Sequence, residues 1–213
     1  ASAPFRRTSV SFLGDIPLIS ERPPSFGLVN RVSKRAFDVA ASAILLVIAA
    51  PLMLFIAALI KLSSRGPVLF LQERVGLEGE TFRMFKFRTM SPGAPAYAKK
   101  PPNGRDPSIT LLGRLLRRTS LDELPQLWNV LRGEMSLVGP RPEMPHIVAD
   151  YDAVHRERLI VPPGMTGMWQ ISRDRHLPIH ENIDYDLYYV YNQSMALDAV
   201  ILARTAVAMF RGH

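Results

Sequence analysis

The sequence predicts an α+β protein that is mostly helical and monotopic in a membrane, with a re-entrant helix-break-helix, a small β-hairpin and interfacial amphipathic helices. Three observations carry this prediction: an almost wholly apolar run from Ala36 to Leu62, two short β-prone stretches after it, and apolar residues at helical spacing among arginines further on. A chain of 213 residues that is 47% apolar is long enough for one domain with a core and short for two. We divide it into an N-terminal arm (1–30), a membrane helix (31–66) and a cytosolic or interfacial domain (67–213).

The net charge of +7 narrows the range of partners without choosing one. A basic surface attracts nucleic acid, acidic lipid head groups or phosphorylated substrates. No helix-turn-helix, zinc-finger or RNP aromatic pattern accompanies the charge, so we expect no nucleic-acid partner. The absence of cysteine excludes disulfides, thiolate metal sites and a thiol nucleophile. His176 and His180 are four residues apart, but Pro178 between them argues against a zinc helix.

The N-terminal arm, residues 1–30, has no sustained apolar period. It contains several serines and arginines together with Pro4, Pro17, Pro23 and Pro24. This composition predicts a flexible, weakly ordered segment. We assign no function to it.

The apolar run from Ala36 to Leu62 has the length of a membrane element. It is interrupted by Asp38, Ser42, Pro51 and Lys61. A buried helix of a soluble protein is the alternative. We do not expect a cleaved signal peptide, because the run starts late and more domain sequence follows it.

The flanks and the middle of this run favour a re-entrant element over a single span. Basic residues lie on both sides, Arg31, Lys34 and Arg35 before the run and Lys61 and Arg65 at its end, which predicts two cytoplasmic ends. Pro51 costs a helix interior roughly 3 kcal/mol, so a bend at Ala50-Pro51 is expected. Two short arms at about 1.5 Å per residue reach only about half of a ~30 Å hydrocarbon core.

The next segment, Pro67 to Phe87, predicts a β-hairpin. Its β-prone stretches are Val68–Leu71 and Thr81–Phe85, and Gly76 and Gly79 separate them. Five prolines and two glycines between positions 91 and 107 predict a loop.

Two later segments predict amphipathic helices. Leucines at 111, 112, 115 and 116 form an apolar stripe with Arg114, Arg117 and Arg118 interleaved, which suits either a membrane surface or a helix packed on the core. The stretch from Leu197 to Phe210 is a second, mainly apolar helix.

The block Thr119–Leu131 carries the candidate chemistry. Leu124, Leu127, Trp128 and Leu131 lie on one helical face, and Ser120 is the expected N-cap. Glu123 is either a capping-box partner of Ser120 or a functional carboxylate. In each case, Asp122 and Glu123 are expected at a helix N-terminus, where free N–H groups and the helix dipole favour ionised carboxylates and attract phosphate.

An ionised aspartate beside a bound phosphate can act as a nucleophile. Because two anions repel each other, this chemistry needs arginines and a divalent cation as screens. Arg117 and Arg118 lie shortly upstream, and Arg141 is held between two prolines in Gly139–Pro142, which suits a fixed guanidinium fork for phosphate.

Several blocks occur together in one order along the chain. They are Lys34-Arg35 with Asp38, Gln72–Gly76, Phe85–Met90, Arg117–Asn129, Ser136–Pro142 and Pro163–Gly167. From about Val32 to Phe210, the chain resembles the bacterial sugar transferase family, the monotopic polyprenol-phosphate phosphoglycosyl transferases.

The resemblance implies that residues 67–213 are the catalytic domain of a phosphoglycosyl-1-phosphate transferase. Asp122 matches the nucleophile, which attacks the β-phosphate of a nucleotide diphospho-sugar and passes the phospho-sugar to polyprenol phosphate. Glu123 matches the second carboxylate of an Asp-Glu dyad. The matches for substrate or phosphate binding are Arg117, Arg141, Lys86 and Asp186.

The resemblance also implies Mg2+ as cofactor, with Asp122 as a ligand; this hard cation prefers oxygen ligands and retains waters. The implied partners are undecaprenyl phosphate, a UDP-sugar and inner-membrane lipids at the cytoplasmic face. The implied pathways are exopolysaccharide, lipopolysaccharide or capsule synthesis.

Two departures from the family pattern stand out. Arg173 occupies a position that usually holds glycine, so the sugar specificity of similar proteins does not transfer to this chain. The membrane break reads Ala50-Pro51 instead of Ser-Pro, and the retained proline predicts that the bend survives. The sugar, the pathway and the oligomeric state are not specified by the sequence. A membrane scaffold without catalysis is the competing interpretation.

Overall fold

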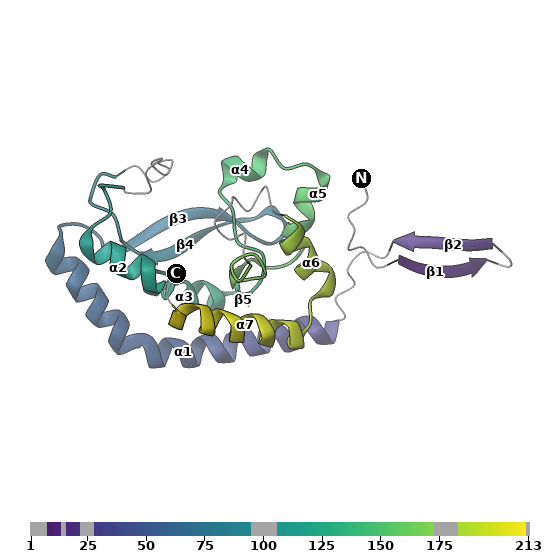
Figure 1. The fold of residues 1–213 in the computed structure, drawn as a ribbon, viewed down its shortest axis with the longest axis horizontal. Coiled ribbons are helices and arrows are strands. Elements are labelled where there is room, and N and C mark those ends of the chain that lie inside the picture. Colours follow the sequence, from purple (N-terminus) through teal and green to yellow (C-terminus); the bar gives the residue numbers. More distant parts are fainter. Residues whose placement is uncertain (1–7, 14–15, 22–27, 95–105, 173–182, 212–213) are drawn as a thin grey trace.

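The computed structural model describes residues 8–13, 16–21, 28–94, 106–172 and 183–211. Its longest element, α1 (Leu28–Ser63), runs along one side of the molecule and changes direction partway along its length (Figure 1). This helix is long and apolar enough to cross a membrane, and only 11% of its most apolar window is buried. That exposure argues against the alternative of a core helix in a soluble protein.

The expected break at Ala50-Pro51 is not a gap between two helices. α1 is one continuous element with Pro51 inside it. A proline removes one N–H donor, and a helix can absorb that loss by bending. The predicted break is therefore not an interruption of the helix, and the bend at Ala50-Pro51 and the re-entrant arrangement in a membrane stay predictions.

The N-terminal arm contains regular structure that we did not expect. β1 (Thr8–Leu13) and β2 (Ile16–Glu21) pair antiparallel, and Figure 1 shows this hairpin apart from the rest of the described chain. In β1, Val10 and Phe12 alternate with serines at the two-residue period of a strand. This pattern is short, and the prolines of the arm favoured the interpretation as a loop. The flexibility of the arm stays a prediction.

The predicted hairpin after α1 is confirmed. β3 (Leu69–Val75) pairs antiparallel with β4 (Thr81–Phe87), from Leu69 opposite Phe87 to Val75 opposite Thr81. The 3-10 turn η1 (Leu77–Gly79) joins the strands, and Gly79 has a φ of 87°. Glycine tolerates this left-handed backbone without a Cβ penalty.

Both amphipathic helices also occur. They are α2 (Leu111–Thr119) and the C-terminal α7 (Met195–Arg211), which lies along the first part of α1 in Figure 1. Further helical elements are η2 (Leu121–Glu123), α3 (Gln126–Arg132), α4 (Pro145–Ala149), α5 (Ala153–Arg156), η3 (Glu157–Ile160) and α6 (Asp184–Asn192).

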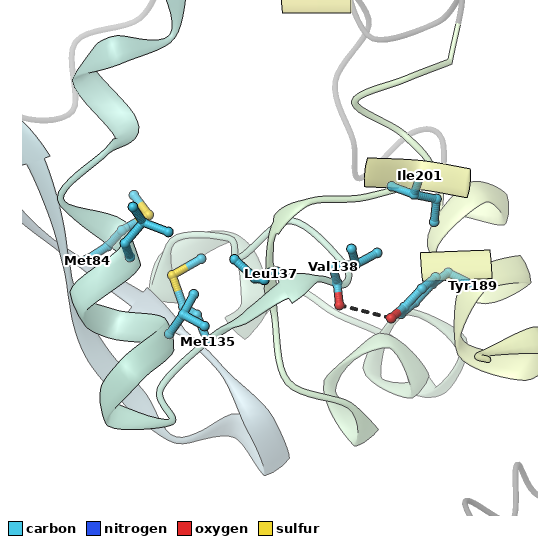
Figure 2. Packing of buried hydrophobic residues seen from close by; sticks show 8 residues of the cluster. Met84, Met135, Leu137, Val138, Tyr189 and Ile201 are labelled. Carbon is cyan, nitrogen blue, oxygen red and sulfur yellow. Dashed lines mark hydrogen bonds between the residues drawn. The ribbon is translucent and has the colours of Figure 1, made fainter. Parts of the chain in front are cut away.

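The core surrounds a short parallel pair, β5 (Ser136–Val138) and β6 (Gly164–Thr166). Buried side chains from the hairpin, β5, α6 and α7 meet there, among them Met84, Leu137, Tyr189 and Ile201 (Figure 2). The Tyr189 hydroxyl donates a hydrogen bond of 2.9 Å to the carbonyl of Val138 (Figure 2). Because β5 leads directly into Gly139–Pro142, this packing fixes the start of the Arg141 loop.

Polar side chains attach the first part of α1 to this core. The Lys34 Nζ lies 2.6 Å from Asp198 Oδ2, and Asp38 Oδ1 accepts a hydrogen bond of 3.1 Å from the Leu137 N–H. All three side chains are buried. Buried charges are stable in a protein when they are paired in this way.

Candidate active site

The Asp122–Glu123 pair lies on the 3-10 turn η2, between α2 and α3. Ser120 has a left-handed backbone, with φ 56°, and its side chain makes no capping hydrogen bond within the described residues. Ser120 thus occupies the N-cap position of η2, as predicted, but its side chain does not cap the turn, and the capping box with Glu123 is not formed. The reversal of direction at Ser120 ends α2 and starts the turn that presents the two carboxylates.

Glu123 is held by two cations from distant parts of the chain. The Lys86 Nζ on β4 lies 2.8 Å from Glu123 Oε1, and Arg141 Nη2 lies 3.6 Å from the same oxygen. Burial alone would raise the pKa of Glu123, but Lys86 and Arg141 outweigh it and lower the pKa to about 2. Glu123 is therefore ionised at neutral pH and binds both cations.

Asp122 is in a different environment from its neighbour. It is 8% exposed, and no ion pair to it occurs among the residues that the structure describes. Burial and the charge of Glu123 raise the pKa of Asp122, while Lys86 and Arg117 act in the opposite direction. Two adjacent carboxylates in different environments are suited to different chemical roles.

Arg117 approaches Asp122 from α2. Its Nε donates a hydrogen bond of 2.9 Å to Thr89 Oγ1. α2 crosses Thr89 so closely that a Cβ on Gly113 would lie 2.0 Å from the Thr89 carbonyl oxygen. The absence of a side chain at Gly113 therefore allows the approach that places Arg117.

The Arg141 loop is held from two sides by other arginines. Arg74 Nη1 donates a hydrogen bond of 3.1 Å to the Pro142 carbonyl, and Arg158 Nη2 donates one of 2.7 Å to the Arg141 carbonyl. A pocket beside this loop has Lys86, Glu123, Gln126, Arg141 and Met165 among its lining residues. The pocket has basic and acidic groups at its edge, as a site for a phosphorylated ligand needs.

Asp186 is not beside the dyad. This fully buried carboxylate on α6 lies 2.5 Å from Arg158 Nη2. Because Arg158 also binds the Arg141 carbonyl, Asp186 is linked to the site through Arg158 and the loop backbone. Sequence reasoning did not single out Arg158, since no local pattern distinguishes it from a surface arginine.

The structure thus brings Asp122, Glu123, Lys86, Arg117 and Arg141 together, and it connects Asp186 to the Arg141 carbonyl through Arg158. Ala50 and Pro51 lie on the exposed face of α1, within the element expected in the membrane. His176, His180 and Arg173 lie outside the described residues. Within the described part of the chain, no group of three or more His, Asp or Glu side chains is placed to hold a metal ion.

Comparisons with known proteins identify the family of the chain. A family model described as bacterial sugar transferase matches residues 29–212. The chain is 38% identical over 201 residues to the exopolysaccharide production protein ExoY of Sinorhizobium fredii, covering 86% of this chain and 89% of that protein. It is 42% identical over 198 residues to the exopolysaccharide production protein PSS of Rhizobium leguminosarum bv. phaseoli, covering 84% and 96% of the two chains.

A third relative is longer than this chain. It is an undecaprenyl-phosphate glucose phosphotransferase of Komagataeibacter xylinus, 44% identical over 188 residues that cover 83% of this chain and 35% of that protein. The family expected from the ordered sequence blocks is confirmed by the extent of these matches. The chain belongs to the bacterial sugar transferase family and is a transferase enzyme.

Proposed function

We propose that this protein transfers a sugar 1-phosphate from a UDP-sugar to undecaprenyl phosphate through a covalent intermediate on Asp122. The observation that carries the proposal is the asymmetry of the dyad: Glu123 is ion-paired with Lys86 and Arg141, whereas Asp122 is buried beside them with a raised pKa. The acceptor agrees with the names of relatives that are undecaprenyl-phosphate glucose and galactose phosphotransferases.

The chemistry divides into two displacements at one phosphorus. A carboxylate oxygen of Asp122 attacks the β-phosphorus of the donor, and the bond to the bridging oxygen breaks, so uridine monophosphate leaves with the bonding electrons. An oxygen of undecaprenyl phosphate then attacks the same phosphorus and restores the Asp122 carboxylate. Each step forms one P–O bond and breaks one.

The basic side chains assist both displacements electrostatically. Arg117 and Arg141 come from different elements, α2 and the loop after β5; Arg117 acts on Asp122 and Arg141 pairs with Glu123, so we expect both to contact a phosphate at the dyad. Lys86 is held by Glu123 and so lies close to the same phosphate. Fixed positive charges at this position stabilise the negative charge that develops at the reacting phosphorus.

A magnesium ion fits this site chemically. Asp122 and Glu123 supply hard oxygen ligands. Burial and the charge of Glu123 raise the pKa of the Asp122 carboxyl despite Lys86 and Arg117, so a cation bound beside it would favour its ionised form. Mg2+ with few protein ligands uses substrate phosphates and waters for the others. When bound, the ion would screen the repulsion between the donor phosphates and the dyad.

We further propose that α1 enters the inner membrane from the cytoplasmic face and returns to it. Near the start of α1, Arg35 donates hydrogen bonds of 2.6 and 2.8 Å to the carbonyls of Val130 and Leu131. At its end, Arg88 donates hydrogen bonds of 3.0 and 3.1 Å to the carbonyls of Ser64 and Arg65. A single span would place the two ends of α1 on opposite sides of the membrane. Both ends are hydrogen-bonded to the same domain, so they lie on the same side.

The covalent step can be tested with donor alone. Purified protein in nanodiscs, incubated with a UDP-sugar but no acceptor, should release uridine monophosphate in an amount equal to the enzyme. Peptide mass analysis should then find the phospho-sugar on Asp122. Asp122→Asn should abolish both signals, and the exposed Asp150→Asn serves as the matched control.

Three results would contradict the proposal. An adduct on another residue would exclude Asp122 as the nucleophile. Product formation without any adduct would mean direct transfer. A wild-type protein that releases no nucleotide with any donor would favour the scaffold interpretation.

A further inference from the structure

The turn that follows β6 is fixed to the Arg141 loop by close backbone contacts. The Gly139 N–H donates a hydrogen bond of 2.9 Å to the Thr166 carbonyl, and Gly164 N–H donates one of 2.8 Å to the Pro140 carbonyl. A Cβ on Gly167 would lie 2.2 Å from the Gly139 carbonyl oxygen. The residues just after Gly167 therefore have a fixed position relative to Arg141.

Arg141 connects this turn to the dyad. Its guanidinium carbon lies 5.8 Å from the centre of the Trp169 ring, and its Nη2 lies 3.6 Å from Glu123 Oε1. A guanidinium group above an indole face is a favourable cation–π arrangement. A group bound beside Arg141 and Glu123 would accordingly be close to Trp169 and its neighbour Gln170.

Three polar atoms of the turn are buried without hydrogen-bond partners among the described residues. They are Trp169 Nε1, Gln170 Nε2 and Gln170 Oε1. Unsatisfied buried polar atoms are rare in native proteins, and a cluster of three beside a reactive site calls for a ligand.

The missing partner must both donate and accept hydrogen bonds. The two nitrogens need acceptors and the Gln170 oxygen needs a donor. Phosphate oxygens would only accept, whereas a sugar hydroxyl does both. Both residues are only partly buried, so part of each side chain is accessible to a ligand.

We propose that the Trp169–Gln170 turn recognises the sugar of the donor and sets the discrimination between sugars. The inference rests on the proposed function, in which the attacked β-phosphorus lies at the dyad. The sugar is bonded to that phosphate, while the uracil is separated from it by the α-phosphate and the ribose. The group that reaches the turn beside Arg141 is therefore the sugar.

Gln170→Met tests the proposal because it keeps the length of the side chain and removes both unpaired atoms. Removing unsatisfied polar atoms should leave the thermal midpoint unchanged or raise it. Loss of a hydrogen bond to the sugar should lower kcat/KM for the preferred donor about tenfold or more. Measurements with UDP-glucose, UDP-galactose and UDP-N-acetylgalactosamine should show that the differences between donors shrink.

Two further variants complete the test. Trp169→Phe keeps the ring beside Arg141 and removes the Nε1 donor, so it should also weaken discrimination. Gln193→Met is the matched control, since the Gln193 amide donates a hydrogen bond to the Tyr189 hydroxyl away from the turn. It should lower the thermal midpoint slightly and leave the donor profile unchanged.

Inhibition by uridine monophosphate separates the sugar from the rest of the donor. Its inhibition constant should be the same for wild type and Gln170→Met. If Gln170→Met weakens the binding of uridine monophosphate as much as that of the donor, the turn binds the nucleotide and the proposal is wrong. An unchanged donor profile in both turn variants would also overturn the proposal. Failure of the wild type to release nucleotide would instead contradict the proposed function itself.

Discussion

Lys86 Nζ lies 2.8 Å from Glu123 Oε1, and this ion pair gives Glu123 a different electrostatic environment from the adjacent Asp122. Burial lowers the pKa of Lys86, while Glu123 and Asp122 support its charge. The pair occupies Glu123, and in the proposed mechanism Asp122 is the carboxylate that reacts. The first two predictions follow from this difference.

Lys86→Met should shift the acidic limb of the pH–rate profile to higher pH. Lys86 lowers the pKa of Asp122, so its removal raises that pKa further, and the ionised nucleophile then appears only at higher pH. Nucleotide release measured across the acidic range checks this. Arg83→Met, an exposed cation on the same strand, should leave the limb in place. An unchanged limb in Lys86→Met would show that Lys86 does not influence the reacting carboxylate.

Acid should lower the thermal stability of the protein, because the Glu123 carboxylate becomes protonated and loses its ion pairs. Its pKa is about 2 in the folded protein against an ordinary value of 4.5, so its contribution is complete above pH 4.5 and disappears as pH falls towards about 2. The thermal midpoint of the wild type should therefore fall more steeply across this window than that of Glu123→Gln. Parallel slopes for the two proteins would refute the ion-paired state of Glu123.

Gly113→Ala should disrupt the position of Arg117. The new Cβ would lie 2.0 Å from the backbone oxygen of Thr89, so α2 must move away from it. Overpacking of this kind destabilises by about 1–3 kcal/mol, and we expect loss of most activity with it. Arg114→Ala, an exposed position on the same helix, is the control for unfolding and for nucleotide release. Normal kinetics in Gly113→Ala would mean that the close crossing is not required.

Arg158→Met should leave the Asp186 carboxylate buried without its cation. Breaking a buried ion pair costs about 3–5 kcal/mol, and the Arg141 loop would also lose the hydrogen bond to its carbonyl. Adding Asp186→Leu should recover much of the stability but little activity, because the loop contact is still missing. A denaturant series and single-turnover kinetics on the single and double variants test both parts. Full recovery of activity in the double variant would assign the pair to stability alone.

Both ends of α1 should be accessible from the cytoplasm. The chain has no cysteine, so single substitutions Val29→Cys and Arg65→Cys provide unique labels at exposed positions. In sealed cells, a membrane-impermeant reagent should label neither, and it should label both after permeabilisation. Labelling of one position in intact cells would establish a full span.

Local patterns in the sequence were enough to predict several elements. The alternation around residues 69–87 and the leucine stripe from 111 to 116 each depend on neighbours within a few positions, so the hairpin and α2 were predicted correctly. The basic flanks and the apolar run likewise indicated α1. The family resemblance came from ordered blocks and named Asp122, Glu123, Arg117, Arg141 and Lys86, which the fold brings together.

The partners of those residues were decided only by the tertiary structure. Glu123 faces Lys86 rather than Ser120, and Arg158 joins Asp186 to the Arg141 carbonyl, although these groups are separated along the chain. Burial and long-range electrostatics depend on which elements pack together, so the same aspartate or arginine is reactive, anchoring or buried according to its neighbours. The sequence by itself therefore determined the elements and the candidate groups, whereas packing around β5 and η2 decided what each group contacts.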